Sequence, residues 1–227
     1  MVDKNNDNHE NSNDRIMMML NKLLACKDEV VDVSPVIQGG PLEAHVISGQ
    51  DCPDCSQVTI AQMTHLMSGM EKTYLETGDQ AIVSRFIGVL NQIKDMAVIV
   101  KGLQGLVECG VGLVCLTKQE PQLRGYLEAL STPIGCLGDK TVKDMILGAK
   151  TQGKTLLEIA FDNAYVYKDK VSELAHYDKV LVALYDHGAD PGETFSNEYT
   201  ARELLRDVFD SDALPSCRAR LNEGGST

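Results

Sequence analysis

The sequence predicts an all-α fold, in which a helical bundle continues into a short stack of helical hairpins. Two observations support this fold class. Aromatic residues make up only 5% of the 227 residues and Trp is absent, whereas β-sandwiches and barrels usually depend on aromatic and β-branched strands. Apolar residues also recur at spacings of three and four along several segments, which is the spacing of one helix face.

The chain carries a formal net charge of −12 and has a pI near 4.8. Binding to nucleic acid depends on Lys and Arg that displace counterions, so this charge argues against a nucleic-acid partner. The seven cysteines form an odd number, and most stand beside apolar residues, as is typical of reduced intracellular thiols. We therefore expect a cytoplasmic protein, of the producing cell or of a host cell if it is secreted, that binds neither nucleic acid nor membrane.

The first 55 residues predict little packed structure. Residues 1–13 are rich in Asn and Asp and predict a disordered tail. A helix is expected at residues 14–27, where apolar residues return at helical spacing. Three prolines interrupt residues 33–55, which predicts a long loop.

A clear helix is expected from residue 56 to residue 76, with a single apolar seam along one face. Such a methionine-rich seam could bind a partner, but we interpret it as ordinary helix-packing core. The seam consists of Ile60, Met63, Met67, Met70 and Tyr74.

The next segments predict further helices. Thr77-Gly78-Asp79 should end one helix and cap the next, and apolar residues from Ile82 to Val100 mark a single long helix. Pro121 stands at a favoured first-turn position of a helix that should run to Leu130. Asp139 should cap a short helix that ends near Leu147.

The segment from Met96 to Leu116 has about the length and apolarity of a membrane span. Lys101, Gln104 and Glu108 fall inside it, and each charge would cost roughly 2.5–3.5 kcal/mol at the centre of a bilayer. Four glycines interrupt it as well. We therefore interpret it as a buried helix followed by a turn.

From residue 153 onward the pattern changes to repeated turns and helix starts. Thr155 and Thr200 each stand where a hydroxyl can cap the start of a helix. Gly188 follows an apolar helix, where glycine adopts a left-handed conformation at low cost. Three groups of residues carry this pattern: Gly153, Thr155, Leu157 and Ala160, then Val180, Leu184, Gly188, Ala189, Asp190 and Pro191, and finally Tyr199, Thr200, Ala201 and Leu204.

These three groups resemble the ankyrin repeat, whose unit reads G-x-T-P-L-H-x-A, then V-V-x-x-L-L-x-x-G-A-D, then the next G-x-T-A-L-D-L. The departures are clear. Leu156 replaces the expected Pro, Glu158 the expected His, and Glu198 a usual Gly. The two capping threonines stand 45 residues apart rather than about 33, so residues 165–175 would be an insertion.

The resemblance implies stacked helix pairs whose fingers bind another protein, without catalysis or a cofactor. The chain would then consist of the tail 1–13, a helical region 14–137, ankyrin-like repeats 138–209 and a flexible tail 210–227. Ankyrin-like repeats beside an unrelated helical region also suit a host-directed bacterial effector. The implied partner-binding residues are the finger and two helix-end positions, with Phe195 as the exposed anchor: Glu193, Thr194, Phe195, Ser196, Asn197, Asp162 and Asn163.

A metal-binding or redox protein is the alternative hypothesis. Cys52 and Cys55 have a spacing that can share a metal or form a redox pair, and His45 and His65 could complete a set of four ligands. No second Cys-x-x-Cys follows and no strand–helix alternation surrounds the pair, so free loop cysteines and no bound metal are expected.

Overall fold

The computed structural model describes residues 46, 48–49, 57–116, 119–135 and 140–223. No strand occurs among these residues, whose β contacts are three isolated bridges. The all-α prediction is therefore confirmed for the described part of the chain. Its helices are α3 (Ile60–Thr77), α4 (Gln80–Gln92), α5 (Met96–Cys115), α6 (Glu120–Ala129), α7 (Val142–Gly148), α8 (Leu156–Val166), α9 (Val171–Asp186), α10 (Ala201–Asp207) and α11 (Pro215–Glu223).

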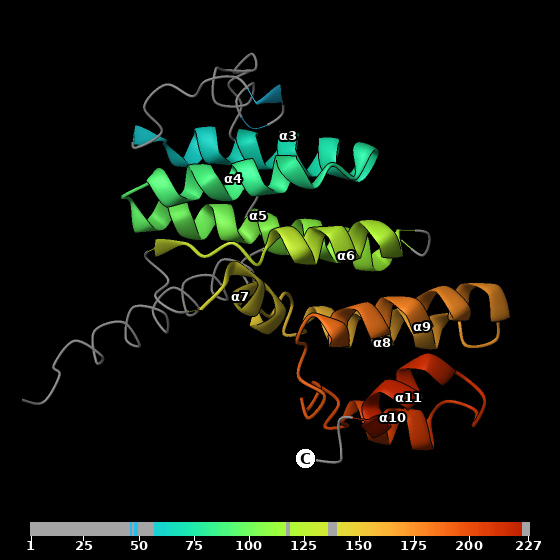
Figure 1. Cartoon of the computed structure of the whole chain (residues 1–227). Coiled ribbons are helices and arrows are strands. Elements are labelled where there is room, and N and C mark those ends of the chain that lie inside the picture. The colour runs from blue at the N-terminus through green and yellow to red at the C-terminus, as the bar shows by residue number, and fades with distance from the viewer. Residues whose placement is uncertain (1–45, 47, 50–56, 117–118, 136–139, 224–227) are drawn as a thin grey trace, which may run out of the picture.

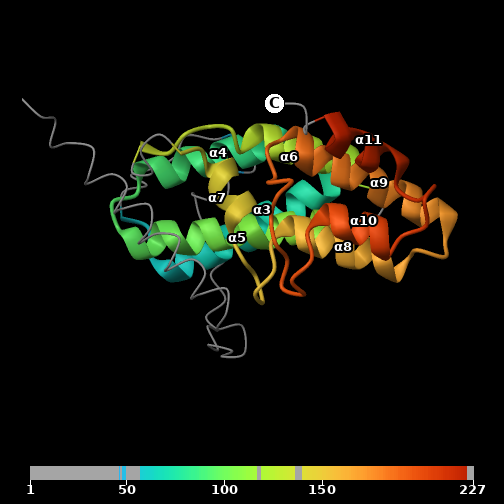
Figure 2. The same ribbon diagram turned by 90° about the horizontal axis from the view of Figure 1, so that it is seen from below.

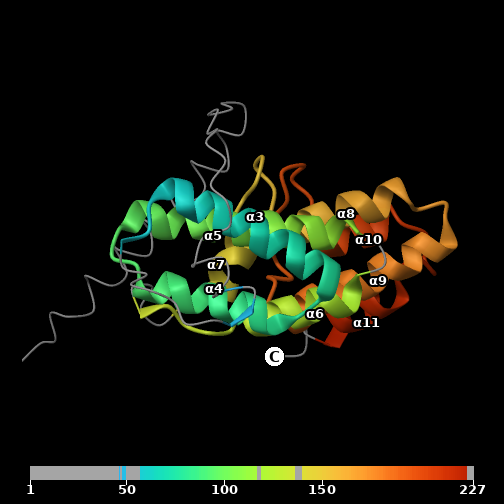
Figure 3. The same cartoon turned by 90° about the horizontal axis from the view of Figure 1, so that it is seen from above.

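The helices stack in layers of two from α3 and α4 to α10 and α11 (Figure 1). Seen along the stack, α3, α5, α8 and α10 form one row, and α4, α6, α9 and α11 form the other (Figures 2 and 3). Direct contacts join α3 to α5, α5 to α8, α4 to α6, α6 to α9, and α9 to α11. A single hydrophobic core runs through all the layers, from Val46 to Leu221.

The seam of α3 is core, as the sequence indicated. Met63, Met67, Met70 and Tyr74 are buried, whereas the first seam residue, Ile60, is 50% exposed. Gly78 ends the helix with φ of 68°, and the Asp79 carboxylate accepts a hydrogen bond from the N–H of Ala81 at the start of α4. The predicted turn between these two helices is therefore confirmed.

The single long helix expected from residue 80 to residue 100 is wrong. The chain breaks between α4 and α5, because Ile93 is extended and Asp95 caps a new helix by accepting from the N–H of Ala97. The turn expected in the next segment is not present, because α5 continues through its four glycines to Cys115. A Cβ on Gly102 would collide with Leu90, so this glycine allows close helix packing instead.

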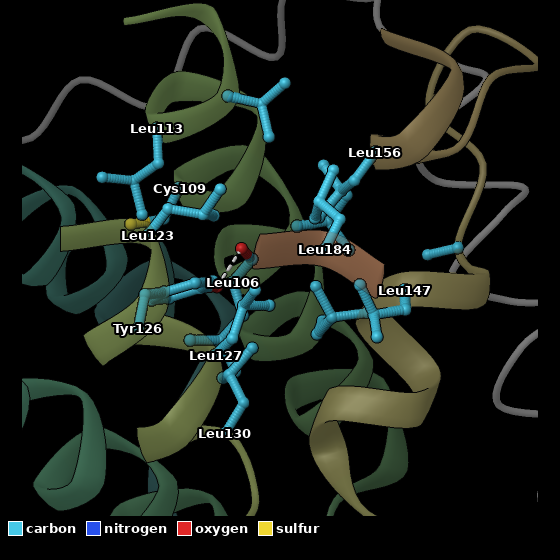
Figure 4. Close-up of a cluster of buried hydrophobic side chains, with 14 of the residues drawn as sticks. Leu106, Cys109, Leu113, Leu123, Tyr126, Leu127, Leu130, Leu147, Leu156 and Leu184 are labelled. Carbon is cyan, nitrogen blue, oxygen red and sulfur yellow. Dashed lines mark hydrogen bonds between the residues drawn. The ribbon is translucent and has the colours of Figure 1, made fainter. Parts of the chain in front are cut away.

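Helix α5 lies at the centre of the molecule. Among the described residues it is the helix with the length and hydropathy of a membrane span, and 72% of the apolar stretch is buried within the bundle. In Figure 4, Leu106, Cys109 and Leu113 of α5 lie among leucines of α6, α8 and α9. The Tyr126 hydroxyl of α6 donates a hydrogen bond to the Leu106 carbonyl at this junction.

Helix α7 packs against α5 and α8. Its cap is Thr141, whose hydroxyl accepts from the N–H of Asp144 while the Asp144 carboxylate accepts in return. The predicted cap, Asp139, lies outside the described residues. So do the predicted tail 1–13, the helix at 14–27, and His45, Cys52 and Cys55.

The flexible tail predicted for residues 210–227 is wrong over its described part. Residues from Pro215 to Glu223 form α11, which packs on α9, with Cys217 and Leu221 buried. The Asp178 carboxylate of α9 accepts from the N–H groups of Ser216 and Cys217. A neighbouring helix thus supplies the cap, which the local sequence of α11 lacks.

Candidate partner-binding site

Two loops project side by side beyond the row of α3, α5, α8 and α10 (Figures 2 and 3). The first finger, residues 150–154, is closed by a bridge between Thr151 and Lys154, and the second finger, residues 193–199, by a bridge between Thr194 and Thr200. Each finger leads directly into a helix. The predicted caps are confirmed, because the hydroxyls of Thr155 and Thr200 accept from backbone N–H groups of α8 and α10.

The second finger is fixed to the start of α8, directly after the first finger. Glu158, buried in the first turn of α8, accepts from the backbone N–H of Ser196 at 3.0 Å and from the Ser196 hydroxyl. In return, the Thr155 hydroxyl donates to the carboxylate of Glu193 at 3.0 Å. These hydrogen bonds therefore attach the second finger to the first turn of α8, the helix that follows the first finger.

The two fingers share a left-handed backbone conformation at the position two residues before each capping threonine. Gly153, two residues before Thr155, has φ of 80°, and Glu198, two residues before Thr200, has φ of 68°. A left-handed backbone favours glycine, so Glu198 stores local strain.

Phe195 is not the exposed anchor that the sequence suggested. Its side chain is only 4% exposed and packs against Phe161 of α8, with the ring centroids 5.5 Å apart. The polar residues around Phe195 face solvent while its own ring completes the core between α8 and α10. It holds the finger in place and does not offer a free contact surface.

The other predicted residues are more accessible. Thr194, Ser196 and Asn197 are exposed, and Glu193 is half-buried, with its pKa raised because burial disfavours the charged form. Asp162 and Asn163 are partly exposed on α8, where Asp162 pairs with Lys154 and Asn163 approaches the sulfur of Cys115. Asn163 therefore lies apart from the finger residues, beside α5.

Asp162 and Asn197 both line a cavity of about 360 Å³ between α8, α10 and the second finger. We call this the aromatic cavity, because most of its wall is aromatic or aliphatic. Beyond the two polar residues, it is lined by Phe161, Tyr165, Tyr199, Leu204, Val208 and Phe209.

The sequence did not single out Tyr165 and Tyr199 as binding residues, although both are prominent in the structure. Tyr165 is 49% exposed and Tyr199 is 42% exposed. Tyr165 also stands edge-on to Phe209, with an interplanar angle of 90° and centroids 6.4 Å apart. The sequence held one signal, because Tyr165 begins the insertion that the ankyrin resemblance implied, and insertions in repeat proteins often lie on the binding face.

The exposed apolar side chains gather around this cavity and the neighbouring turn between α8 and α9. Val166, the last residue of α8, and Val171, the first residue of α9, are 71% and 85% exposed. A second cavity of about 340 Å³ is lined by Val171 and Leu174 of α9 and by the loop before α11. Large apolar side chains that face water in one region are typical of surfaces that bind another macromolecule.

The described residues contain no group of three or more His, Cys, Asp or Glu side chains that could hold a metal ion. Cys52, Cys55 and His45 lie outside these residues, so the alternative hypothesis stays a prediction. Asp178 lies close to His176 in the sequence, but both of its carboxylate oxygens accept hydrogen bonds from N–H groups at the start of α11.

Comparison of the chain with models of protein families, with curated proteins and with solved structures found no match.

Proposed function

We propose that this protein is a non-enzymatic interaction module that binds another protein through the aromatic cavity and the second finger. The observation that carries the proposal is the position of the exposed apolar side chains. Six large apolar side chains are exposed among the described residues, and four of them, Tyr165, Val166, Val171 and Tyr199, lie around the cavity and the adjacent turn. Tyrosines of this kind are enriched at protein interfaces.

The rigidity of the surface supports the same function. The second finger is held by Phe195 in the core and by the hydrogen bonds of Ser196 to Glu158. A surface that is already ordered loses little conformational entropy when a partner binds. The side chains at its rim, Asp162 and Asn197, add polar groups that can fix the orientation of the partner.

The ankyrin resemblance also favours this proposal. Helical hairpins in a stack, threonine-capped helices and paired fingers are the features that ankyrin-like proteins use to present a binding face. In this chain both fingers project from the same row of helices (Figures 2 and 3), and Asn197 and Tyr199 of the second finger line the aromatic cavity.

The test is capture of interacting proteins from native extract with the full-length chain and two variants. Tyr165→Ser combined with Tyr199→Ser should abolish capture of the specific partner, whereas Ile60→Ser should leave it intact. Ile60 is a matched control because it is 50% exposed but lies on α3, at the other end of the stack. Equal recovery with all three proteins would show that the cavity is not the binding site.

A further inference from the structure

The aromatic cavity combines several rings with a single charged group in its lining. Four of its wall residues are aromatic, and Asp162 is the only ionisable carboxylate, ammonium or guanidinium group among the residues that line it. The Asp162 side chain is 47% exposed, and its ion pair with Lys154 is made through Oδ2. Oδ1 of this carboxylate therefore retains its capacity to accept a hydrogen bond.

The rings are arranged as walls that stand at steep angles to one another. Phe209 is perpendicular to Tyr165, and Phe161 is inclined by 59° to Phe209 with the centroids 6.5 Å apart. A cation is attracted to the electron-rich face of an aromatic ring, and the attraction is strengthened when several rings and a carboxylate surround the same space.

The protein itself provides an example of this attraction at the same ring. The Nζ atom of Lys168 lies 4.6 Å from the centroid of the Tyr165 ring. Lys168 is not among the residues that line the aromatic cavity, whereas Tyr165 is. The same ring therefore contacts an ammonium group and borders the cavity.

We propose that the aromatic cavity receives a basic side chain, an arginine or a lysine, from the partner polypeptide. This inference rests on the proposed function and specifies the chemistry of its partner. The net charge of −12 supports it, because an acidic protein attracts basic segments and speeds their encounter. An acidic side chain would be repelled by Asp162, and an apolar side chain would leave this carboxylate without a new partner.

The experiment titrates the ¹⁵N-labelled full chain with three probes and follows its amide resonances. The probes are the peptide acetyl-Gly-Ser-Arg-Ser-Gly-amide, the same peptide with the neutral isostere citrulline in place of arginine, and ethylguanidinium. The arginine peptide should shift amides of residues 161–166 and 197–209, and citrulline should weaken the binding about ten-fold. Ethylguanidinium, which carries the same head group, should shift the same amides. Equal binding of the arginine and citrulline peptides would overturn the proposal.

Two variants separate a specific site from general attraction to an acidic surface. Asp162→Asn should weaken binding of the arginine peptide about two- to five-fold. Glu76→Gln removes the same charge from an exposed position on α3 and should change the affinity less than about two-fold. Identical effects of the two variants would contradict the assignment. If capture of a partner depends on Tyr165 and Tyr199 while the arginine peptide does not bind, the cation inference fails and the proposed function stands.

Discussion

The carboxylate of Glu158 in α8 accepts hydrogen bonds from both the backbone N–H and the hydroxyl of Ser196, which lies 38 residues further along the chain. Glu158 is only 3% exposed, so these neutral donors replace water around a buried charge. The contact fixes the second finger to the helix that follows the first finger. The proposed binding face thus depends on a side chain that is itself buried.

Replacing Glu158 should loosen the finger and destabilise the fold. Glu158→Ala leaves the Ser196 N–H without its acceptor and should cost about 2–3 kcal/mol of unfolding free energy in urea titrations. Glu158→Gln keeps one acceptor oxygen and should cost about 1 kcal/mol. Glu76→Ala on the exposed face of α3 is the control and should stay within about 0.5 kcal/mol of the parent protein. Equal stability of Glu158→Ala and the control would mean that the finger is not held by this contact.

Removal of the Phe195 ring should be costly, because the ring is core and not an exposed anchor. Phe195→Ala should lower the free energy of unfolding by about 3–5 kcal/mol, as expected for a buried phenylalanine. Tyr199→Ala, which removes an exposed ring of the same finger, should cost less than about 1 kcal/mol. If Phe195→Ala cost as little as Tyr199→Ala, the Phe195 ring would be exposed, as the sequence suggested.

The local features of the fold were predictable from sequence because they depend on neighbouring residues. Gly78 and Asp79 at one turn, and Thr155 and Thr200 at two helix starts, act within a few residues of their own position. The seam of α3 was also visible, since helical spacing alone determines which face of a helix is apolar.

The features that were missed depend on residues far apart in the chain. Phe195 is buried because Phe161 lies beside it, and nothing in the polar sequence around Phe195 indicates this neighbour. Helix α11 forms with Asp178 of α9 as its cap, a contact that spans 38 and 39 residues. The break before α5 could have been found, because Asp95 is a favoured capping residue that interrupts the apolar pattern.

The cap that Asp178 provides should control access to the thiol of Cys217. This thiol is fully buried, and burial raises its pKa to about 12, so alkylation in the native protein should be slow. Asp178→Ala removes the acceptor for two N–H groups, which should increase local opening by about 1–2 kcal/mol. We expect iodoacetamide labelling of Cys217 to rise about five- to thirty-fold in peptide mass spectra. Labelling of Cys109, buried in α5, should not change; a parallel rise there would indicate global unfolding instead of opening of α11.

Because of Glu193, we expect the free energy of unfolding to rise as the pH falls through the titration range of this carboxyl group. Burial beside Glu158 and Asp190 raises its pKa above the ordinary value of 4.5, against the opposing effects of the Thr155 hydrogen bond and Lys150. The folded state therefore binds more protons than the unfolded state just above this value, and its stability falls as the pH rises through the window. Glu193→Gln can still accept from Thr155, so the variant should be more stable than the parent at pH 7. In urea titrations this advantage should disappear below the ordinary carboxyl pKa, whereas an advantage independent of pH would refute the assignment.

The strain at Glu198 predicts a substitution that stabilises the protein. Its φ of 68° matches the 80° of Gly153 at the equivalent place in the first finger. A left-handed conformation costs roughly 1–2 kcal/mol for a residue with a Cβ, while glycine adds entropy to the unfolded chain. Glu198→Gly should therefore raise the free energy of unfolding by about 0.5–1 kcal/mol in urea titrations. The reciprocal change, Gly153→Ala, should lower it by about 1 kcal/mol, because no atom crowds the new Cβ and only the backbone conformation opposes it. A destabilised Glu198→Gly together with a neutral Gly153→Ala would show that these two positions are not conformationally equivalent.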